Sequence, residues 1–293
     1  MPELPEVETI ARGLARRFVG RRILRCRHLS PHLLEGRGRS VLRALRGRRI
    51  LDIRRRGKHL IFVVDGGYVM VFHLKMTGQF LASAAEDTRD RHTHLVLSFD
   101  RGRELRFRDT RKFGRLRLAR KDAQAALPKG LGPEPLEVGR NRFLELLGRR
   151  RGRLKSLLLN QGFVAGIGNI YADEILFEAR LSPVRPASGL EPSEAQRLWS
   201  GMRRILSRAV TCGGSSIRDY TDADGRPGRF QFEHKVYGRA GRPCPRCGVP
   251  IRRLVIGGRS THFCPFCQKE KSAGRRFLRA RSLRIQPLAK AGV

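Results

Sequence analysis

Apolar residues recur every three or four positions at the beginning of the chain. This spacing is typical of an amphipathic α-helix, so residues 4–18 are predicted to form one helix with a single apolar face. That face comprises Val7, Ile10, Ala11, Leu14, Ala15 and Phe18. Pro2 and Pro5 stand at the start of the helix, where proline is tolerated because the first N–H groups have no partner within the helix.

From about residue 22 to residue 120, helical spacing gives way to short apolar runs separated by turns. Alternating runs bounded by glycine-rich turns are typical of antiparallel strands. The expected strands are residues 50–53, 59–64, 68–74, 94–99 and 105–108, with turns at residues 65–67 and 100–102. The pattern predicts an antiparallel β domain, most simply a β-sandwich.

Helical spacing returns after a segment rich in proline and glycine. Residues 127–135 contain three prolines and two glycines, which is typical of a linker. The helices expected after it are residues 141–147, 154–160 and 170–178, and one opened by Ser193 and Gln196 in capping-box spacing. We expect five parts: a domain over 1–127, a linker over 128–139, a helical domain over 140–240, a finger over 241–268 and a tail over 269–293.

The strongly positive charge of the chain narrows the range of possible binding partners. With 62 Lys and Arg against 26 Asp and Glu, the formal net charge of the 293 residues is +36. A polyanion is the simplest partner, and nucleic acid fits better than a membrane surface, although genomic arginine bias would account for part of the charge. No apolar run approaches the roughly 18 residues of a membrane span, and the acidic N-terminus is unlike a signal peptide. We expect an intracellular protein.

Four of the six cysteines form the most specific motif of the sequence. They occur as Cys244-x2-Cys247-x16-Cys264-x2-Cys267, a spacing that predicts a four-cysteine zinc site in a reducing compartment. Four thiolates close the coordination shell of one Zn²⁺, so the metal is expected to be structural. The hairpin between the pairs places Arg259 near its tip, where it could contact a phosphate. Cys26 and Cys212 are expected to be inert packed thiols.

The N-terminus carries candidate catalytic chemistry. If Met1 is removed, the ring nitrogen of Pro2 becomes a free secondary amine beside Glu3. An α-amino group has a pKa of about 8, against about 10.4 for lysine, so a useful fraction is uncharged and nucleophilic at neutral pH. The alternative is that the prolines only start the helix and that Glu3, Glu6 and Glu8 complement its positive end. The first residues alone do not decide between these two interpretations.

Further candidate residues lie in turns and loops. Lys58 follows a glycine just before a strand, and Met76 and Phe113 sit on turns where an apolar side chain could wedge into stacked bases, with Arg111 beside them to face an unpaired base. Each of these is also compatible with ordinary turn chemistry. Asn169 is predicted to cap a helix that follows three glycines, a suitable phosphate clamp or a simple helical hairpin. A long polar, glycine-rich loop extends from residue 213 to residue 228.

The order of these motifs closely resembles that of the bacterial formamidopyrimidine-DNA glycosylases over residues 2–268. The resemblance implies an α+β multidomain fold with an N-terminal β-sandwich and helix, a helix-two-turn-helix domain and a zinc finger. It implies a monomeric, cytoplasmic base excision repair enzyme that acts on double-stranded DNA. Such an enzyme excises oxidised purines, such as 8-oxoguanine and formamidopyrimidines, and cleaves the strand by β,δ-elimination.

The same resemblance implies roles for individual residues. Pro2 would be the nucleophile, Glu3 the acid and base at the sugar, and Lys58 an assisting cation at the lesion phosphate. Met76, Arg111 and Phe113 would fill the gap left by the flipped base. Contacts to DNA are implied for His92, Arg111, Lys155, Asn169, Arg239 and Arg259. A lesion-recognition loop is implied around residues 215–230, beginning with Ser215, Ser216, Ile217, Arg218, Asp219 and Tyr220.

Two departures and two alternatives accompany this interpretation. Asn160 stands where relatives commonly carry an aspartate, and residues 269–293 form a tail with eight Lys or Arg against one acid. One alternative is an endonuclease VIII-type enzyme for oxidised pyrimidines, and the other is a noncatalytic zinc protein that binds damaged DNA. Pro2 with Glu3 favours an enzyme. Leu4, the wedge residues and the long polar loop favour the purine-type enzyme.

Overall fold

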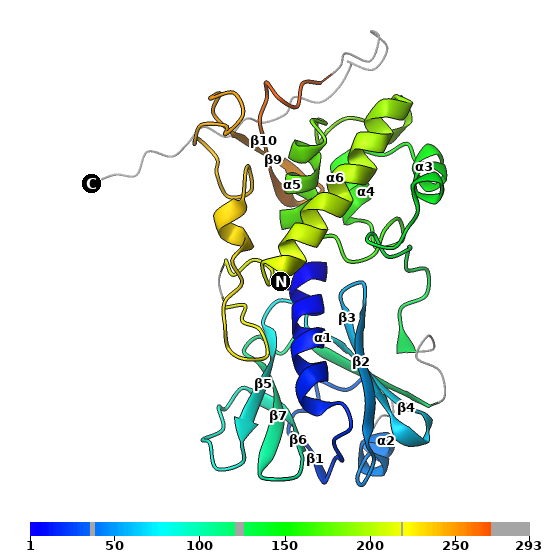
Figure 1. Ribbon diagram of the computed structural model, residues 1–293, viewed down its shortest axis with the longest axis vertical. Coiled ribbons are helices and arrows are strands. Elements are labelled where there is room, and N and C mark those ends of the chain that lie inside the picture. The colour runs from blue at the N-terminus through cyan, green and yellow to red at the C-terminus, as the bar shows by residue number, and fades with distance from the viewer. Residues whose placement is uncertain (36–38, 121–125, 218, 271–293) are drawn as a thin grey trace, which may run out of the picture.

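The computed structural model describes residues 1–35, 39–120, 126–217 and 219–270. Arg218 and most of the basic tail lie outside the described residues. Figure 1 shows two lobes stacked along the long axis, with the first turn of helix α1 at their junction. The lower lobe contains the β-sheets, and the upper lobe contains the remaining long helices and the C-terminal hairpin.

The lower lobe consists of two four-stranded antiparallel sheets, which confirms the predicted sandwich. One sheet has the order β2 (Ile50–Arg56), β3 (His59–Val64), β4 (Tyr68–His73) and β8 (Arg115–Arg120). The other has the order β1 (Arg25–His28), β6 (Thr93–Ser98), β7 (Arg103–Asp109) and β5 (Gly78–Ala84). The rings of Phe62, Phe72, Phe80 and Phe107 pack between the sheets, with centroids 4.8 to 5.6 Å apart.

Helix α1 (Leu4–Phe18) has the bounds that its apolar spacing predicts. Its apolar face is buried in the same core as the inner faces of the two sheets. Each fully buried Leu, Ile or Phe side chain contributes about 1.5 to 3 kcal/mol relative to an exposed one. A capping box starts the helix: the Glu6 carboxylate accepts the backbone N–H of Glu3 at 2.8 Å. The two acids are therefore fixed relative to one another.

The upper lobe is built from α3 (Arg140–Gly148), α4 (Leu154–Leu159), α5 (Asn169–Glu178) and α6 (Pro192–Thr211). Two predicted helix starts are corrected. Helix α6 begins with Glu191 as N-cap and Glu194 three residues later, not with Ser193 and Gln196, because Pro192 suits the first helical position. Helix α5 has Gly168 as its N-cap, so Asn169 is its first helical residue.

The C-terminal hairpin consists of β9 (Arg252–Ile256) and β10 (Arg259–Phe263). Gly257 and Gly258 form its tip with positive φ angles of 55° and 72°. Arg259 pairs with Ile256 beside this tip, as predicted. Shorter elements are α2 (Arg39–Ala44) and the 3₁₀ helices η1 (Asp65–Gly67), η3 (Ala187–Gly189) and η4 (Phe230–Glu233).

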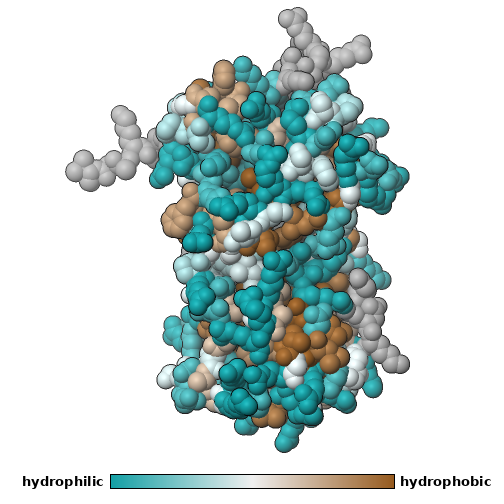
Figure 2. Space-filling model, viewed as in Figure 1, coloured by the Kyte–Doolittle hydropathy of each residue, from teal (hydrophilic) through white to brown (hydrophobic). Residues whose placement is uncertain are grey.

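A buried ion-pair cluster joins the linker to the lower lobe. Glu134 forms ion pairs with Arg55 at 2.6 Å and Arg56 at 2.9 Å, and it accepts the backbone N–H of Gly57 at 2.6 Å. The linker thereby fixes the β2–β3 turn that carries Lys58. Figure 2 shows a largely hydrophilic surface with apolar patches near the junction and on the lower lobe. None of the helices among the described residues could cross a membrane.

Candidate active site and nucleic-acid interface

The N-terminal residues lie where the first turn of α1 meets the N-terminus of α5. Pro2 is buried, and Glu3 is only 3% exposed. The Glu3 carboxylate accepts backbone N–H groups of Gly168 at 2.7 Å, Ile170 at 3.0 Å and Tyr171 at 3.5 Å. A helix N-terminus offers unpaired N–H groups and a positive dipole end, so it holds this carboxylate in place beside Pro2.

Two glycines allow this close approach. A Cβ atom on Gly168 would lie 2.3 to 2.7 Å from the Glu3 carboxyl group, closer than any real contact. A Cβ atom on Gly166 would lie 2.8 Å from the Leu4 side chain, and Gly166 has a φ of +96° that favours glycine. Only glycine at positions 166 and 168 leaves room for Leu4 and Glu3 to pack against the start of α5.

Glu6 is a second buried carboxylate beneath Glu3. It accepts hydrogen bonds from the Tyr171 hydroxyl at 2.5 Å and from the Ser215 backbone N–H at 2.7 Å, in addition to that of Glu3. Burial and the charge of Glu3 raise the pKa of Glu6 to about 7, although these hydrogen bonds oppose the increase. Glu6 thus connects the N-terminus to α5 and to the loop after α6.

Lys58 lies in the electrostatic field of the same carboxylates. Its side chain is buried, and burial lowers the pKa of Lys58. The negative charges of Glu3 and Glu6 oppose this decrease, whereas the Arg259 guanidinium adds to it. The lower lobe and the finger therefore place positive charge around the N-terminal acids.

Two exposed turns of the lower lobe carry the predicted wedge residues. Met76 is 39% exposed and Phe113 is 44% exposed. The Arg111 guanidinium lies 4.7 Å from the centroid of the Phe113 ring. Asp109 connects the two turns, because it accepts the Thr77 hydroxyl at 2.5 Å and the Arg111 backbone N–H at 3.2 Å. The structure thus connects the turn that carries Met76 to the turn that carries Arg111 and Phe113.

The predicted phosphate contacts of the upper lobe lie at the boundary between α5 and the finger. Arg259 is exposed, whereas Asn169 and Arg239 are half-buried. The Asn169 side-chain amide donates to the Ser260 carbonyl at 2.9 Å. Among the described residues, Asn169 Oδ1 and Arg239 Nε are buried without a hydrogen-bond partner. Asn169 therefore joins α5 to the strand that carries Arg259.

The loop after α6 is anchored at its beginning and exposed further along. Ser215 is buried, and its hydroxyl lies 3.0 Å from His234 Nε2. The Ser216 hydroxyl donates to the Tyr220 carbonyl at 2.6 Å. Ile217 is 49% exposed, and Asp219 is also exposed. Ser215 therefore anchors the loop to the acids at the N-terminus, whereas Ile217 and Asp219 are exposed to solvent.

The four sulfur atoms of the finger fit a tetrahedral zinc site. All four lie within 4.8 Å of one another, with 3.9 Å between Cys244 and Cys267 and 3.5 Å between Cys247 and Cys264. Zn–S bonds of about 2.3 Å in a tetrahedron place sulfur atoms about 3.8 Å apart. The donor set and its dimensions thus suit one four-coordinate metal ion, with no position left for a reacting water.

Comparison with known proteins decides the family. Models of the formamidopyrimidine-DNA glycosylase N-terminal domain, its H2TH domain and the zinc finger found in FPG and IleRS match residues 1–116, 131–221 and 241–269. The formamidopyrimidine-DNA glycosylase of Solibacter usitatus is 46% identical over 270 residues, which cover 92% of this chain and all of the relative. The chain belongs to the formamidopyrimidine-DNA glycosylase family. It is therefore an enzyme of the DNA glycosylase class.

Solved structures of the family agree with this fold. A Lactococcus lactis Fpg variant in complex with Fapy-dG-containing DNA has a TM-score of 0.86 at 37% identity and covers 92% of this chain and all of its own. The MutM (Fpg) protein of Thermus thermophilus has a TM-score of 0.82 at 46% identity, with the same coverage. The implied order of sandwich, helix-two-turn-helix domain and finger is confirmed.

One residue of this glycosylase requires a correction. Lys155 was expected to contact DNA, but its side chain is fully buried. Its ammonium group forms a 2.6 Å ion pair with Asp173 and donates to the Asn169 carbonyl at 2.9 Å. Asp173 also accepts the His262 backbone N–H at 2.9 Å. Lys155 therefore supports the contact between α5 and the finger and has no exposed surface for a phosphate.

His92 is half-buried at the end of the loop between β5 and β6. Side chains of β7 bind this loop. Asp90 accepts the His92 backbone N–H at 2.9 Å and pairs with Arg108. Arg106, which is buried, donates to three carbonyl groups earlier in the loop and pairs with Glu104 at 2.8 Å. These contacts with β7 thus fix the position of His92.

Sequence reasoning missed Tyr171, Asp173 and Glu174 on α5. Glu174 accepts the backbone N–H groups of residues 235–237 at 2.8 to 3.0 Å, and it orients the segment before the finger. Burial raises the pKa of Glu174, and its backbone hydrogen bonds oppose that increase. The one available signal was two adjacent acids in the middle of a helix whose other central residues are apolar or aromatic on all sides.

Proposed function

We propose that this glycosylase is bifunctional. It excises oxidised purines such as 8-oxoguanine and formamidopyrimidines from double-stranded DNA and cleaves the strand by β,δ-elimination, with the amine of Pro2 as nucleophile. The relatives support the partner: the Lactococcus lactis complexes contain DNA with Fapy-dG or an abasic site. We further propose that it works as a monomer in the bacterial cytoplasm.

The observation that carries the proposal is the position of Pro2. It is buried beside Glu3, whose carboxylate is held by backbone amides of α5, whereas Met1 is 45% exposed. Removal of Met1 would leave a secondary amine at the border between solvent and the buried acids. A protein that only binds DNA has no need of such an arrangement.

The first chemical step joins the sugar to the protein. A lesion nucleotide rotated out of the stack brings its C1′ atom to the Pro2 nitrogen. The nitrogen lone pair forms a bond to C1′ as the bond between C1′ and the base breaks; the base leaves with the bonding electrons and takes up the proton that the Pro2 nitrogen gives up. Met76, Arg111 and Phe113 fill the gap and face the base that lost its partner. Lys58 stabilises the lesion phosphate.

The second stage cleaves the strand. Glu3 in its acid form protonates the sugar ring oxygen, the bond from C1′ to that oxygen breaks, and an iminium ion forms between C1′ and Pro2. The iminium acidifies the C2′ proton, and its loss expels the 3′ phosphate in β-elimination. A further elimination expels the 5′ phosphate. One amine thus serves both base excision and strand cleavage.

The metal of the finger is proposed to be Zn²⁺. Its ligands would be Cys244, Cys247, Cys264 and Cys267, and the ion would supply folding energy to the hairpin and no reaction chemistry. The hairpin then holds Arg259 for a phosphate, while Asn169, Arg239 and His92 provide further phosphate contacts. The loop at residues 215–220 would contact the flipped base.

A substrate panel tests the proposal. Duplexes containing 8-oxoguanine, thymine glycol or an abasic site are incubated with the protein, and released bases and strand ends are measured. We expect rapid excision of 8-oxoguanine, slower release of thymine glycol, and ends that carry phosphate on both sides of the gap. Preference for thymine glycol would indicate the endonuclease VIII type, and binding without cleavage would indicate a noncatalytic damaged-DNA-binding protein.

A further inference from the structure

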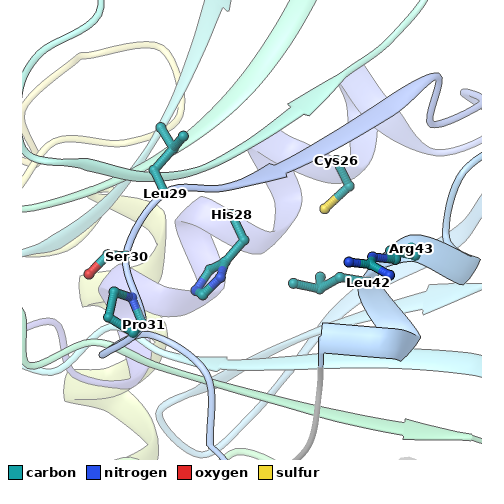
Figure 3. A pocket seen from close by; sticks show the side chains of 7 residues that line it. All are labelled: Cys26, His28, Leu29, Ser30, Pro31, Leu42 and Arg43. Atoms are coloured by element: carbon teal, nitrogen blue, oxygen red, sulfur yellow. The ribbon is translucent and has the colours of Figure 1, made fainter.

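Two hollows of about 430 Å³ each lie side by side on the lower lobe and share Leu29, Ser30 and Pro31 as a common wall. Figure 3 shows the first hollow, where Leu42 and Arg43 of α2 face Cys26 and His28 of β1. Burial raises the pKa of the Cys26 thiol to about 12, so this hollow contains no reactive nucleophile.

The second hollow is cationic and borders the wedge turn. Besides the shared wall, it is lined by His32, Asp90, Arg91, Thr93, His94 and Lys112. His32, Arg91 and Lys112 are exposed, and no carboxylate in the described part of the chain forms an ion pair with any of them. Asp90 is the acid of the lining, and Arg108 neutralises it. The hollow therefore has a net positive charge.

Lys112 is held in place by its backbone. It has a φ of +57°, and its neighbours Arg111 and Phe113 are the proposed wedge residues. The Arg115 guanidinium donates to the carbonyl groups of Lys112 at 3.1 Å, Phe113 at 3.0 Å and Gly114 at 2.9 Å. Any shift of this turn would break several hydrogen bonds, so the wedge and the Lys112 side of the hollow form one rigid unit.

The chemistry of the lining selects a phosphate over a base. Its exposed groups are an ammonium, a guanidinium and an imidazole, and two nearly buried hydroxyl residues, Ser30 and Thr93, complete it. No Phe, Tyr or Trp is among the described residues that line it, so it lacks the large aromatic rings that form a stacking platform for bases. Cations and hydroxyl groups are the side chains that bind backbone phosphates.

We propose that this hollow binds a backbone phosphate of the undamaged strand, an inference that rests on the proposed function. In the proposed function, Lys58, Asn169 and Arg259 contact phosphates of the damaged strand around Pro2. Arg111 and Phe113 face the base left without a partner, which belongs to the opposite strand. Lys112, which lies between Arg111 and Phe113 in the same turn, lines the hollow. Binding there fixes the undamaged strand while the lesion nucleotide is rotated out.

Single neutral phosphates test the inference. Duplexes carry 8-oxoguanine or a stable abasic analogue, and methylphosphonates replace the phosphates of the undamaged strand one at a time near the lesion. We expect one or two positions to weaken wild-type binding by about threefold to tenfold, the range for the net contribution of one solvent-exposed hydrogen bond. Lys112→Gln should weaken binding to the unmodified duplex equally and remove the sensitivity at those positions, whereas Lys112→Arg should retain it.

The control is Lys129→Gln, which removes an exposed lysine from the linker and should behave like wild type in every duplex. Thermal melting confirms that each variant is folded. If Lys112→Gln keeps the full methylphosphonate sensitivity, or if neutral phosphates matter only on the damaged strand, the inference is wrong. In that case wild-type excision of 8-oxoguanine remains intact, whereas failure of the proposed function would abolish excision itself.

Discussion

Two glutamates one helical turn apart, Glu3 and Glu6, share one buried environment but have different partners. Glu3 is held by backbone amides of α5, whereas Glu6 is held by the Tyr171 hydroxyl and the Ser215 backbone. Burial and the nearby charge of Glu3 both disfavour the charged form of Glu6, so its pKa is raised.

The raised pKa of Glu6 predicts how stability depends on pH. Its pKa is about 7 in the folded protein, against about 4.3 for an unfolded chain. Between these values the folded state binds more protons, so stability falls as pH rises through this window and levels off above pH 7. We expect the free energy of unfolding of wild type minus that of Glu6→Gln to fall by roughly 2 to 3 kcal/mol between pH 4.5 and pH 7.

Denaturant unfolding at several pH values measures this difference, and Glu8→Gln provides a control of opposite sign. Burial raises the pKa of Glu8, but the charges and hydrogen bonds of Arg55 and Arg12 outweigh burial, so the net shift is downward. Its contribution is present above the unfolded pKa and is lost as pH falls. A Glu6→Gln difference that is constant with pH would show that Glu6 does not titrate in this window.

At the scale of elements, the start of α5 determines whether the site can form. The N-cap Gly168 lies against the Glu3 carboxyl group, and the glycine two residues earlier lies against Leu4. Gly168→Ala would place a methyl group inside the van der Waals radius of Glu3. We expect a loss of stability of about 1 to 3 kcal/mol, typical of overpacking, and a larger loss of excision because Glu3 is displaced.

Thermal melts and single-turnover excision assays measure the two effects. Gly152→Ala is the matched control, because no atom lies within 4 Å of its added Cβ. Wild-type excision by Gly168→Ala would show that Glu3 does not need its place at the N-terminus of α5.

The finger is a second element with a separable role. It carries Arg259, and it reaches α5 through Asp173 and His262. Cys264→Ser, or removal of the metal by a chelator, should weaken duplex binding and leave Pro2 and Glu3 in place, since metal binding folds the hairpin. Zinc content, duplex affinity and excision at saturating protein are the measurements. Normal affinity without metal would rule out this role.

Elements with a strong apolar pattern could be predicted from the sequence, and others could not. Helix α1 has its predicted bounds because one continuous stripe is buried. Strands β1, β5 and β8 were missed because most of their residues are only half-buried or exposed, which leaves no clear alternation to read. The start of α6 was misplaced because two acids, Glu191 and Glu194, form its capping box.

The candidate site shows the same division. Pro2, Glu3 and the four finger cysteines could be predicted as site residues because each belongs to a short sequence motif that indicates its chemistry. The partners of Glu3 are 165 or more residues away in the chain, so their contact is a property of the fold. Lys155 was assigned to DNA because a single sequence gives no sign that Asp173 pairs with its buried charge.

At the scale of the whole molecule, positive charge and the junction of the lobes act together. The net charge of +36 attracts a polyanion to both lobes, and the N-terminal amine lies where the lobes meet. The linker glutamate and the Glu3–α5 contacts fix the lobes relative to each other. The duplex can therefore be held from two sides while the chemistry occurs between them.

Salt dependence tests this mode of binding. Each phosphate that the protein neutralises releases counterions and contributes about −0.9 to the slope of log affinity against log salt. With roughly four to six phosphate contacts we expect a slope between roughly −3 and −6 for a lesion duplex. Fluorescence anisotropy over a range of NaCl concentrations gives the slope, and a flat response would contradict phosphate-dominated binding.

The most direct test of the central claim is to trap the covalent intermediate. Borohydride reduces an iminium between the sugar and the protein to a stable amine, and peptide mapping then locates the linked residue. On an 8-oxoguanine duplex we predict a crosslink at Pro2. Trapping should be lost in a protein that retains Met1, because its Pro2 nitrogen is part of an amide bond. Pro2→Gly should impair excision, and Glu3→Gln should impair excision while leaving lesion binding largely intact. A crosslink at Lys58, or full activity with Met1 in place, would contradict the mechanism.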